Sequence, residues 1–299
     1  MKESLIIAVA GLGIIGGSLA RAFRAKGFEV LGIDADGEAL SAAVSEGVVS
    51  EDSFNINSQD EICFQALKKA DVVFICTPVL SIVPVVRKLA PFVKKGAILT
   101  DTGSTKRFVV NSMKEVLPEG VDFVGGHPMA GSHYSGYDFS RADLFSKSPY
   151  ILTPTAETSP ETVETLKSLI LKIGAVPYIM PPEEHDRIVA AISHLPQVVA
   201  TSLVNAVREF DHSGYYLKLA GKGYKDTTRI ASSSTGIWVD ILLTNRDEVL
   251  KMISIYKRQL DELEAAIELA SVQDIKRIFY KARDYMNGRD EGFGCDTGR

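Results

Sequence analysis

A histidine in a glycine-rich segment is the first candidate for chemistry in this chain. His127 stands in the segment GGHPMAG, residues 125–131, directly after an apolar run at residues 121–124. Imidazole titrates near neutral pH, so a histidine on the tip that follows a strand is suited to general base catalysis. A structural histidine in a turn is the alternative. Ser104 follows another apolar run and could hydrogen-bond the imidazole or a substrate hydroxyl, or it could equally cap a helix.

Two polar segments farther along the chain could anchor a substrate. Residues 193–196 (SHLP) place His194 beside a proline interruption in an otherwise apolar helical stretch. A buried imidazole needs a partner, which a substrate carboxylate or the protein core could supply. Residues 221–229 (GKGYKDTTR) contain Lys225 and end at Arg229, whose planar guanidinium suits bidentate binding of a carboxylate; a surface salt bridge is the alternative. Trp238, the only tryptophan, could wall an apolar ring pocket or fill the core.

The first 34 residues predict a dinucleotide site. An apolar run at residues 5–10 ends at Gly11, Gly13 and Gly16 in the order G-x-G-x-x-G, and a helical stretch and a second apolar run follow. These glycines permit a tight turn, close approach of the backbone to a pyrophosphate, and close packing of the helix on the strand. Unpaired N–H groups at the start of the helix would face the phosphates.

Asp34, at the end of the second apolar run, predicts the choice of cofactor. It lies eighteen residues past Gly16, where its carboxylate can accept hydrogen bonds from both hydroxyls of the adenosine ribose and would repel a 2'-phosphate. The sequence therefore favours NAD over NADP. The predicted cofactor-binding residues are Gly11, Leu12, Gly13, Ile14, Ile15, Gly16, Asp34, Thr77, Pro78 and Ser104.

Strand and helix patterns alternate through the first 180 residues, as a doubly wound sheet requires. Further strands are expected at residues 71–76, 97–101, 121–124 and 176–180, and helices at 38–46, 82–92 and 160–173, with Pro84 in the first turn of the second of these helices. Ligands of such sheets lie beyond the carboxyl ends of the strands. The polar segments 77–78, 101–106 and 125–131 are therefore expected to face the nicotinamide end of the cofactor.

The last third of the sequence has helical patterns only, at residues 183–210 with an interruption near Pro196, then at 235–243, 247–269 and 274–286. We predict an α/β Rossmann-type dinucleotide-binding domain at 1–180, an all-α substrate and dimerisation domain at 181–287, and a flexible tail at 288–299. These helices are strongly apolar for so small a domain, so part of their surface is expected to be buried in a homodimer.

Composition excludes several classes of protein. The 299 residues carry a formal charge of −5 with 45% hydrophobic residues, so no broad basic surface for nucleic acid is expected. Cys63, Cys76 and Cys295 are scattered, which indicates neither a disulfide framework nor a zinc site, and no metal is predicted. The N-terminal apolar run is too short for a signal peptide, and no later stretch is expected to span a bilayer. A soluble protein in a reducing cytoplasm fits these features.

Taken together and in order, these motifs resemble those of the prephenate dehydrogenases of the aromatic amino-acid pathway. The resemblance runs to about residue 286. It rests on the glycine turn with Asp34, on DTGSTK at 101–106, on GHPMAG at 126–131, on SHLP at 193–196 and on KDTTR at 225–229. It implies oxidative decarboxylation of prephenate by NAD, giving 4-hydroxyphenylpyruvate for tyrosine synthesis, without a metal.

The resemblance also implies roles for particular residues. His127 would accept the proton of the substrate's C4 hydroxyl, and Ser104 would position that hydroxyl and the imidazole. Arg229 would bind a substrate carboxylate, with His194 helping to hold the substrate. Some relatives carry a gating glutamate where this chain has His133, which could favour an anionic substrate side chain. Some also carry a C-terminal module that senses amino acids; none is expected here, so tyrosine inhibition would have to act at the active site.

Three other functions stay open at this stage. An arogenate or broad cyclohexadienyl dehydrogenase would use the same groups. A hydroxyacid or imine dehydrogenase of similar build typically relies on a lysine of the helical domain, whereas the leading candidate here, His127, belongs to the sheet domain. A non-catalytic NAD sensor would need no base, so the presence of His127, Ser104 and Arg229 together favours an enzyme.

Overall fold

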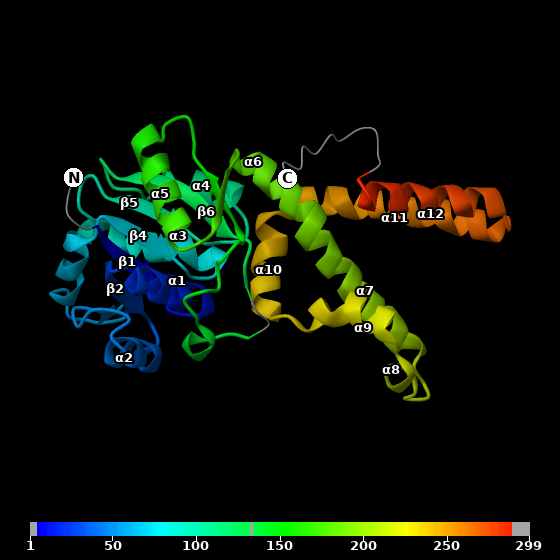
Figure 1. Cartoon of the computed structure of the whole chain (residues 1–299), viewed down its shortest axis with the longest axis horizontal. Helices are drawn as coiled ribbons and strands as arrows, with labels where there is room; N and C mark the ends of the chain where they lie inside the picture. The colour runs from blue at the N-terminus through cyan, green and yellow to red at the C-terminus, as the bar shows by residue number, and fades with distance from the viewer. Residues whose placement is uncertain (1–4, 132–133, 289–299) are drawn as a thin grey trace. The chain divides into compact units, whose positions relative to one another are not determined.

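An eight-stranded sheet forms the centre of the N-terminal half of the chain (Figure 1). The computed structural model describes residues 5–131 and 134–288. The strand order is β3-β2-β1-β4-β5-β6-β7-β8; β1 to β6 are parallel, β7 pairs antiparallel with β6, and β8 is parallel to β7. The strands are β1 (Ile6–Ala10), β2 (Glu29–Asp34), β3 (Phe54–Asn55), β4 (Val72–Ile75), β5 (Ile98–Asp101), β6 (Asp122–Pro128), β7 (Pro149–Thr153) and β8 (Val176–Ile179).

Helices cover both faces of this sheet. One core cluster joins the sheet to side chains of α1, α2 and α5, and the other joins it to α3, α4 and a 3₁₀ helix at Cys63–Lys69. Successive residues of β1 belong to opposite clusters, Ile7 and Val9 to the first and Ala8 and Ala10 to the second, which is why β1 is apolar throughout. The helices are α1 (Ile14–Ala25), α2 (Gly37–Ser45), α3 (Val79–Leu89), α4 (Arg107–Met113) and α5 (Pro160–Lys172).

The glycine turn between β1 and α1 is packed too tightly for side chains. Gly11 has φ +96°, and a Cβ on it would lie 2.7 Å from the carbonyl oxygen of Cys76. A Cβ on Gly16 would lie 1.8 Å from the carbonyl oxygen of Gly11. A Cβ on Gly13 would meet no atom within 4 Å, so Gly13 faces open space. The first and third glycines therefore serve packing, and the second leaves room for a ligand.

The rest of the described chain is helical. Its helices are α6 (Pro182–Val189), α7 (Leu195–Phe210), α8 (Tyr216–Leu219), α9 (Lys222–Thr228), α10 (Thr235–Thr244), α11 (Arg246–Glu268) and α12 (Val272–Met286), with a 3₁₀ turn at Arg229–Ser232. The predicted fold class is confirmed. The chain divides into two compact units, Met1–Glu248 and Val249–Arg299. The predicted boundary after residue 180 falls inside the first unit, where α6 begins, and it stays a prediction.

A widened turn joins α6 to α7. Ala190–His194 form a π-helical turn, in which the N–H of Leu195 donates to the carbonyl of Ala190. Pro196 follows at once and has no N–H to donate, so the ordinary hydrogen bond back to Ile192 cannot form. This turn is the predicted interruption, and it fixes the position of His194.

Two sequence expectations about elements are wrong, and one helix was not expected. His127 does not lie on a loop after a strand: β6 continues through residues 125–128, because β7 pairs with it and places Ile151 opposite His127. Helix α3 begins at Val79 instead of residue 82, so Pro84 lies in its second turn. The glycine-containing polar segment at residues 221–229 is mostly helical, as α9.

One helical stretch passes a length-and-composition test for a membrane span, which was not expected from the sequence. The continuous helical stretch Pro182–Phe210 is long and apolar enough to pass such a test, which core helices of soluble proteins pass as well. It also holds the fully buried polar residues His185 and Asp186. Several of its apolar side chains are exposed, Phe210 by 69% and Ile192 by 63%.

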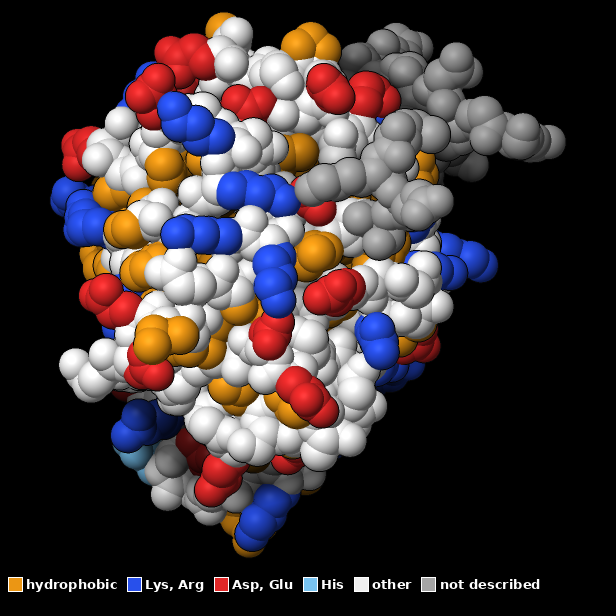
Figure 2. Space-filling model, turned by 90° about the vertical axis from the view of Figure 1, so that its left-hand side faces the viewer, with side chains coloured by type: hydrophobic (Ala, Val, Ile, Leu, Met, Phe, Trp, Pro, Cys, Tyr) orange, Lys and Arg blue, Asp and Glu red, His pale blue; other side chains and the backbone are white. Residues whose placement is uncertain are grey.

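Charges of both signs share the surface. On the face drawn in Figure 2, Lys and Arg side chains are interspersed with Asp and Glu and with single apolar groups. That face carries no broad basic field, as the formal charge of −5 leads one to expect.

The tight packing at Gly16 leads to a prediction about stability. Gly16→Ala should lower the free energy of unfolding by roughly 2–3 kcal/mol or more, because the new Cβ must push α1 away from the glycine turn. Gly37→Ala is the matched control, since a Cβ at that first residue of α2 meets nothing within 4 Å. Denaturant unfolding of both variants measures the difference, and equal stabilities would contradict this account of Gly16.

Candidate active site

A cleft of about 560 Å³ opens at the carboxyl ends of β1, β2 and β4. Gly11, Gly13, Asp34, Thr77 and Pro78 line it, all of which the sequence singled out. The residues that sequence reasoning missed there are Ala10, Ile33, Ala35, Ile56, Asn57, Cys76, Ser81, Pro84, Val85 and Lys88. They come mainly from the ends of β1, β2 and β4, from the segment after β3 and from α3, which approach one another only in the fold.

The cleft fits a dinucleotide. Gly13 leaves open space beside the start of α1, where unpaired N–H groups of a helix attract phosphate. Asp34 accepts hydrogen bonds from the backbone N–H groups of Leu12 and Asp36, which fix its carboxylate at the rim. Leu12 is fully buried, so it can reach a cofactor only through its backbone, and the partly buried Ile15 packs against the core.

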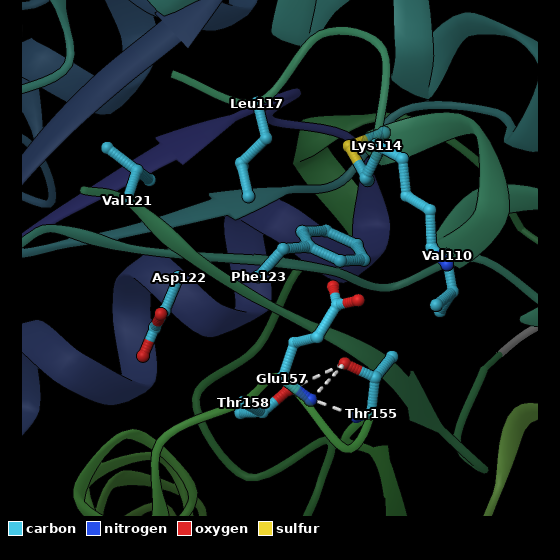
Figure 3. A pocket seen from close by; sticks show the side chains of 10 residues that line it. Val110, Lys114, Leu117, Val121, Asp122, Phe123, Thr155, Glu157 and Thr158 are labelled. Atoms are coloured by element: carbon cyan, nitrogen blue, oxygen red, sulfur yellow. Dashed lines mark hydrogen bonds between the residues drawn. The ribbon is translucent and has the colours of Figure 1, made fainter. Parts of the chain in front are cut away.

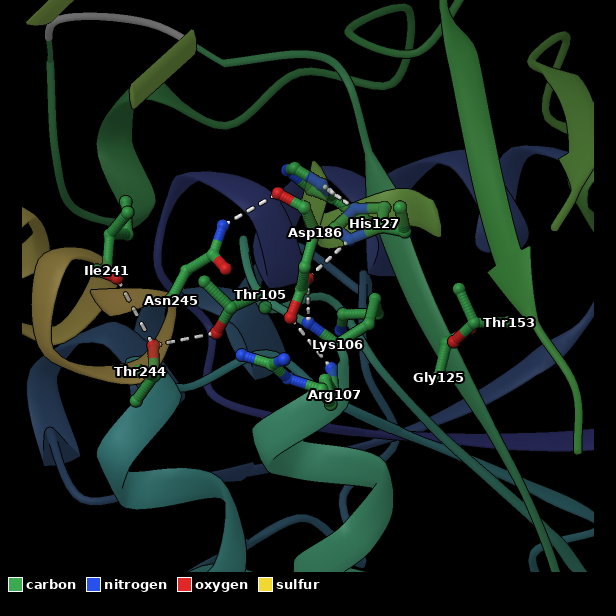
Figure 4. A network of polar contacts seen from close by, with 12 residues as sticks. Thr105, Lys106, Arg107, Gly125, His127, Thr153, Asp186, Ile241, Thr244 and Asn245 are labelled. Atoms are coloured by element: carbon green, nitrogen blue, oxygen red, sulfur yellow. Dashed lines mark hydrogen bonds and ion pairs between the residues drawn. The ribbon is translucent and has the colours of Figure 1, made fainter. Parts of the chain in front are cut away.

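His127 belongs to a chain of hydrogen bonds that the sequence did not reveal (Figure 4). Its Nδ1 lies 2.8 Å from Nε2 of His185, and Nδ1 of His185 lies 2.8 Å from Oδ1 of Asp186. His185 and Asp186 are fully buried in α6, while His127 is partly exposed. No hydrogen bond joins Nε2 of His127 to any described residue, so this nitrogen can serve a ligand.

The carboxylate of Asp186 also caps helix α4. Oδ1 accepts from the backbone N–H of Lys106 at 2.7 Å, and Oδ2 accepts from that of Arg107 at 3.0 Å. Unpaired N–H groups at a helix start favour such a negative charge. Asp186 therefore ties the start of α4 to the histidine pair.

A buried ion pair lies below this network. The ammonium of Lys106 contacts the carboxylate of Asp101 and donates to the carbonyl of Gly126 at 2.7 Å, and both charged side chains are completely buried. Asp101 also accepts from the N–H groups of Gly103 and Gly126. Asp101 thereby connects the loop that carries Ser104 to the strand that carries His127.

His194, on the widened turn, has its own partners. Its Nδ1 lies 3.2 Å from Nδ2 of Asn245, and Trp238 stands edge-on to its ring at a centroid distance of 6.0 Å. Nδ2 of Asn245 also donates to the carbonyl of Asp186 at 2.8 Å. A carbonyl only accepts, so the NH₂ end of Asn245 must face this pair, and Nδ1 of His194 must be the acceptor. The proton of a neutral His194 then sits on Nε2.

Burial keeps these imidazoles neutral. It lowers the pKa of His127 well below the ordinary 6.5, and the nearby His185, Lys106 and His194 lower it further. Burial also lowers the pKa of His185, against the opposing effect of its hydrogen bond to Asp186. It lowers the pKa of His194 to about 4. A neutral histidine at neutral pH is the form that a general base requires.

The remaining predicted residues are more scattered. Ser104 is half-buried in the loop before α4. Arg229 is exposed and shares a cavity of about 800 Å³ with Ile14, at the start of α1, and with Arg141, which sequence reasoning missed. Lys225 is exposed on α9 and lines none of the cavities described here. His133 lies outside the described residues, as does the tail from residue 289 onward.

Another hollow, of about 370 Å³, contains none of the predicted site residues (Figure 3). Its apolar floor comes from α4, β6 and the residues that precede β6, and Lys114, Asp122 and Glu157 stand at its edge. Among the described residues no group of three His, Cys, Asp or Glu could hold a metal ion.

Both halves of the chain match models of one protein family. Residues 19–179 match the prephenate dehydrogenase nucleotide-binding domain, and residues 181–281 match the prephenate dehydrogenase dimerization domain. This chain belongs to the prephenate dehydrogenase family. The first match begins after the glycine turn, so the turn is supported by its geometry instead.

Individual relatives agree with this assignment. The chain is 39% identical to a prephenate dehydrogenase of Bacillus subtilis, over 96% of this chain and 76% of that one. It is 32% identical to a cyclohexadienyl dehydrogenase of Zymomonas mobilis, over 87% and 88% of the two chains. The predicted family and enzyme class are confirmed: the chain is an NAD-dependent dehydrogenase.

Solved structures of the family are similar throughout. A prephenate dehydrogenase from A. aeolicus, in complex with hydroxyphenyl propionate and NAD+, superposes with a TM-score of 0.87 at 30% identity, over 96% of this chain and 99% of that one. An arogenate dehydrogenase of Synechocystis superposes with a TM-score of 0.82 at 31% identity, over 96% and 100%.

The buried histidines of this prephenate dehydrogenase family member predict its stability in acid. Their pKa values are lower in the folded chain than the 6.5 of an unfolded one, so the unfolded chain takes up protons first as the pH falls. Stability should be complete above pH 6.5 and fall below it, by about 1.4 kcal/mol per pH unit for each such histidine.

Denaturant unfolding between pH 7 and pH 5.5, at fixed protein concentration, measures this slope above the range in which carboxylates titrate. His212→Gln removes an exposed histidine and should leave the slope unchanged. A stability that stays constant from pH 7 to pH 5.5 would show that the three imidazoles are not held neutral by the fold.

Proposed function

We propose that this prephenate dehydrogenase family member converts prephenate and NAD to 4-hydroxyphenylpyruvate, carbon dioxide and NADH, with His127 as the general base. The observation that carries the proposal is the place of His127 at the carboxyl end of β6, where Nδ1 contacts His185 and Nε2 has no hydrogen-bond partner among the described residues. Because β1, β4, β5 and β6 are parallel, that end of β6 lies at the same edge of the sheet as the dinucleotide cleft.

The protein groups have a direct chemical task. When bound, NAD accepts the hydride that leaves C4 of the substrate. His127 accepts the proton of the C4 hydroxyl at Nε2 as the C4–H bond breaks, so that a carbonyl forms at C4. The C–C bond to the ring carboxylate then breaks and carbon dioxide leaves. The electron pair of that bond passes through the ring to the C4 oxygen, which takes back the proton from His127 to give the phenol. Aromatisation makes this sequence effectively irreversible. Ser104, in the loop before α4, would orient the hydroxyl toward His127.

The substrate carboxylates need cationic or donor partners. We assign one carboxylate to Arg229, supported by its place in the cavity beside the start of α1. His194 offers a neutral Nε2–H donor, and Trp238 against its ring offers an apolar wall. Lys225, exposed on α9, and His133 stay predictions as substrate contacts.

Cofactor choice follows from Asp34. Its carboxylate at the rim of the cleft can accept from the ribose hydroxyls of NAD, and the same negative charge repels the 2'-phosphate of NADP. Lys88 also lines the cleft, and its ammonium would attract a 2'-phosphate. The preference for NAD over NADP therefore depends on the balance between the carboxylate of Asp34, held by backbone N–H groups, and the flexible ammonium of Lys88.

Assembly, regulation and location belong to the same proposal. A homodimer is supported by exposed apolar side chains on the helices of the segment that matches a dimerization domain, among them Leu243, Leu250 and Phe279. Tyrosine inhibition at the active site and a cytoplasmic setting are proposed with it, the latter because Cys63 and Cys76 are free thiols.

Arogenate is the second candidate substrate. The observation in its favour is the 31% identity and TM-score of 0.82 to the arogenate dehydrogenase of Synechocystis, which is close to the similarity with the A. aeolicus prephenate dehydrogenase. Arogenate would meet the same His127, because it differs from prephenate only in the side chain that carries an amine in place of the keto group.

A direct assay tests the function. The purified protein should form NADH, followed by absorbance, with prephenate and NAD, and should turn over far more slowly with NADP. His127→Asn should lower kcat by roughly a hundredfold or more with little change in NAD affinity. Turnover of arogenate alone would keep the mechanism and change the substrate. No turnover of either substrate despite NAD binding would contradict the proposal.

The anchor assignment gives a separate prediction. Arg229→Gln should mainly raise KM for prephenate, because a carboxylate bound equally in ground and transition states contributes uniform binding. Arg258→Gln, at an exposed arginine of α11 that lines none of the cavities described above, is the control and should change neither constant. A normal KM for Arg229→Gln would assign the carboxylate to another residue.

A further inference from the structure

The hydrogen bonds behind His127 point to a specific task for α6. We propose that His185 and Asp186 are positioning residues that hold His127 in the tautomer with its proton on Nδ1, which leaves the lone pair of Nε2 for the substrate. This inference rests on the proposed function, in which His127 is the base. Neither residue was among the candidates that the sequence suggested.

The direction of each hydrogen bond follows from Asp186, the last group in the series His127–His185–Asp186. The ionised carboxylate of Asp186 has only acceptor oxygens, and it already accepts from two backbone N–H groups of α4. His185 must therefore donate to it from Nδ1, at 2.8 Å. A neutral imidazole with its proton on Nδ1 has only a lone pair on Nε2. The Nδ1 of His127, 2.8 Å from that nitrogen, must then be the donor.

The same assignment of donors and acceptors excludes the other tautomer of His127. With its proton on Nε2, the lone pair on Nδ1 of His127 would face the lone pair on Nε2 of the fully buried His185 across 2.8 Å. A buried polar atom that faces another acceptor loses its hydrogen bond and is left unsatisfied, which is strongly unfavourable. A free imidazole has no such bias toward Nδ1, so the network, and not the imidazole itself, sets the tautomer.

The charges around the base favour this arrangement during turnover. Lys106, the residue that precedes α4, opposes protonation of His127, but its ammonium is compensated by Asp101 at the end of β5. His194 on the widened turn is neutral, and Arg107 of α4 pairs with Asp247. Asp186 of α6 is the remaining charged group, and it stabilises the imidazolium of protonated His127 through His185. It does so by a fixed hydrogen bond, as the orienting carboxylates of catalytic triads do.

His185 and Asp186 also connect the two segments that match the family models. His127 belongs to the nucleotide-binding segment, and His185 and Asp186 belong to the segment that matches the dimerization domain. The base is therefore completed only when α6 lies against β6. Because Asp186 caps α4, the same contact fixes the loop that carries Ser104.

Two substitutions at one position separate orientation from packing. His185→Leu fills the site without hydrogen bonds, and should lower kcat by about tenfold to a hundredfold while KM for prephenate and Kd for NAD stay within about twofold. His185→Gln retains an amide oxygen that can accept from Nδ1 of His127, and should recover part of that loss. His212→Leu, at an exposed histidine, is the control and should change nothing.

A spectroscopic readout tests the tautomer itself. The chain has only five histidines, so ¹⁵N-histidine labelling of the full-length protein gives a resolvable spectrum, in which His127→Asn identifies the His127 signals. In the unsubstituted protein His127 should show a protonated Nδ1 and an unprotonated Nε2. In His185→Leu the proton should move largely to Nε2, and in His185→Gln it should return to Nδ1.

The outcomes separate this inference from the function on which it rests. Normal turnover by His127→Asn would remove His127 as the base and the positioning role with it, whereas no turnover of either substrate by the unsubstituted protein would contradict the proposed function. Loss of activity in His127→Asn with normal kcat and an unchanged tautomer in His185→Leu would overturn only the positioning role. If His185→Leu does not fold, the spectrum of the unsubstituted protein still decides, because a proton on Nε2 of His127 contradicts the proposal.

Discussion

The carboxylate of Asp186 is the contact on which the rest of the site depends. It is fully buried, yet it accepts hydrogen bonds from the N-terminus of α4 and from the imidazole of His185. An ionised carboxylate is stable in such a place only when several donors converge on it. Those donors come from two segments separated by some eighty residues, so the position of α6 on the sheet domain and the orientation of His127 are set by one group.

Burial lowers the pKa of His127, and it also makes any charge in this site dependent on a direct partner. The same desolvation that lowers the pKa of His127 would expel the charge of Lys106, were Asp101 and the carbonyl of Gly126 not in contact with its ammonium. Removing either partner of a buried ion pair typically costs more than the pair contributes, because an unpaired charge is left behind. The loop after β5, which carries Ser104, is therefore held in place by a buried ion pair and by the hydrogen bond from Gly103 to Asp101.

The sequence predicted the parts of this structure that local chemistry determines. The glycine turn, Asp34 and the start of α5 at Pro160 follow from residues near one another in the chain, and the cofactor cleft forms around the first two. β7 was missed, so the glycines before His127 suggested a loop where a strand continues. His185 and Asp186 follow two glutamates at a helix start, where a solvated charged face is the ordinary expectation. Only docking of α6 against β6 and α4 makes them buried partners, and no short pattern encodes that docking.

The imidazoles of His127 and His194 adopt opposite tautomers, because the first faces a hydrogen-bond acceptor and the second faces a donor. His185 presents an acceptor to His127, and Asn245 presents a donor to His194. In the proposed reaction the first must take a proton from a hydroxyl, and the second must give a hydrogen bond to a carboxylate or a carbonyl. Both can do so while neutral. This matters because a charged His194 would lower the basicity of His127 further, and burial prevents that by lowering the pKa of His194 to about 4. The acid and base character of the two rings is therefore decided by their buried hydrogen bonds, before any substrate arrives.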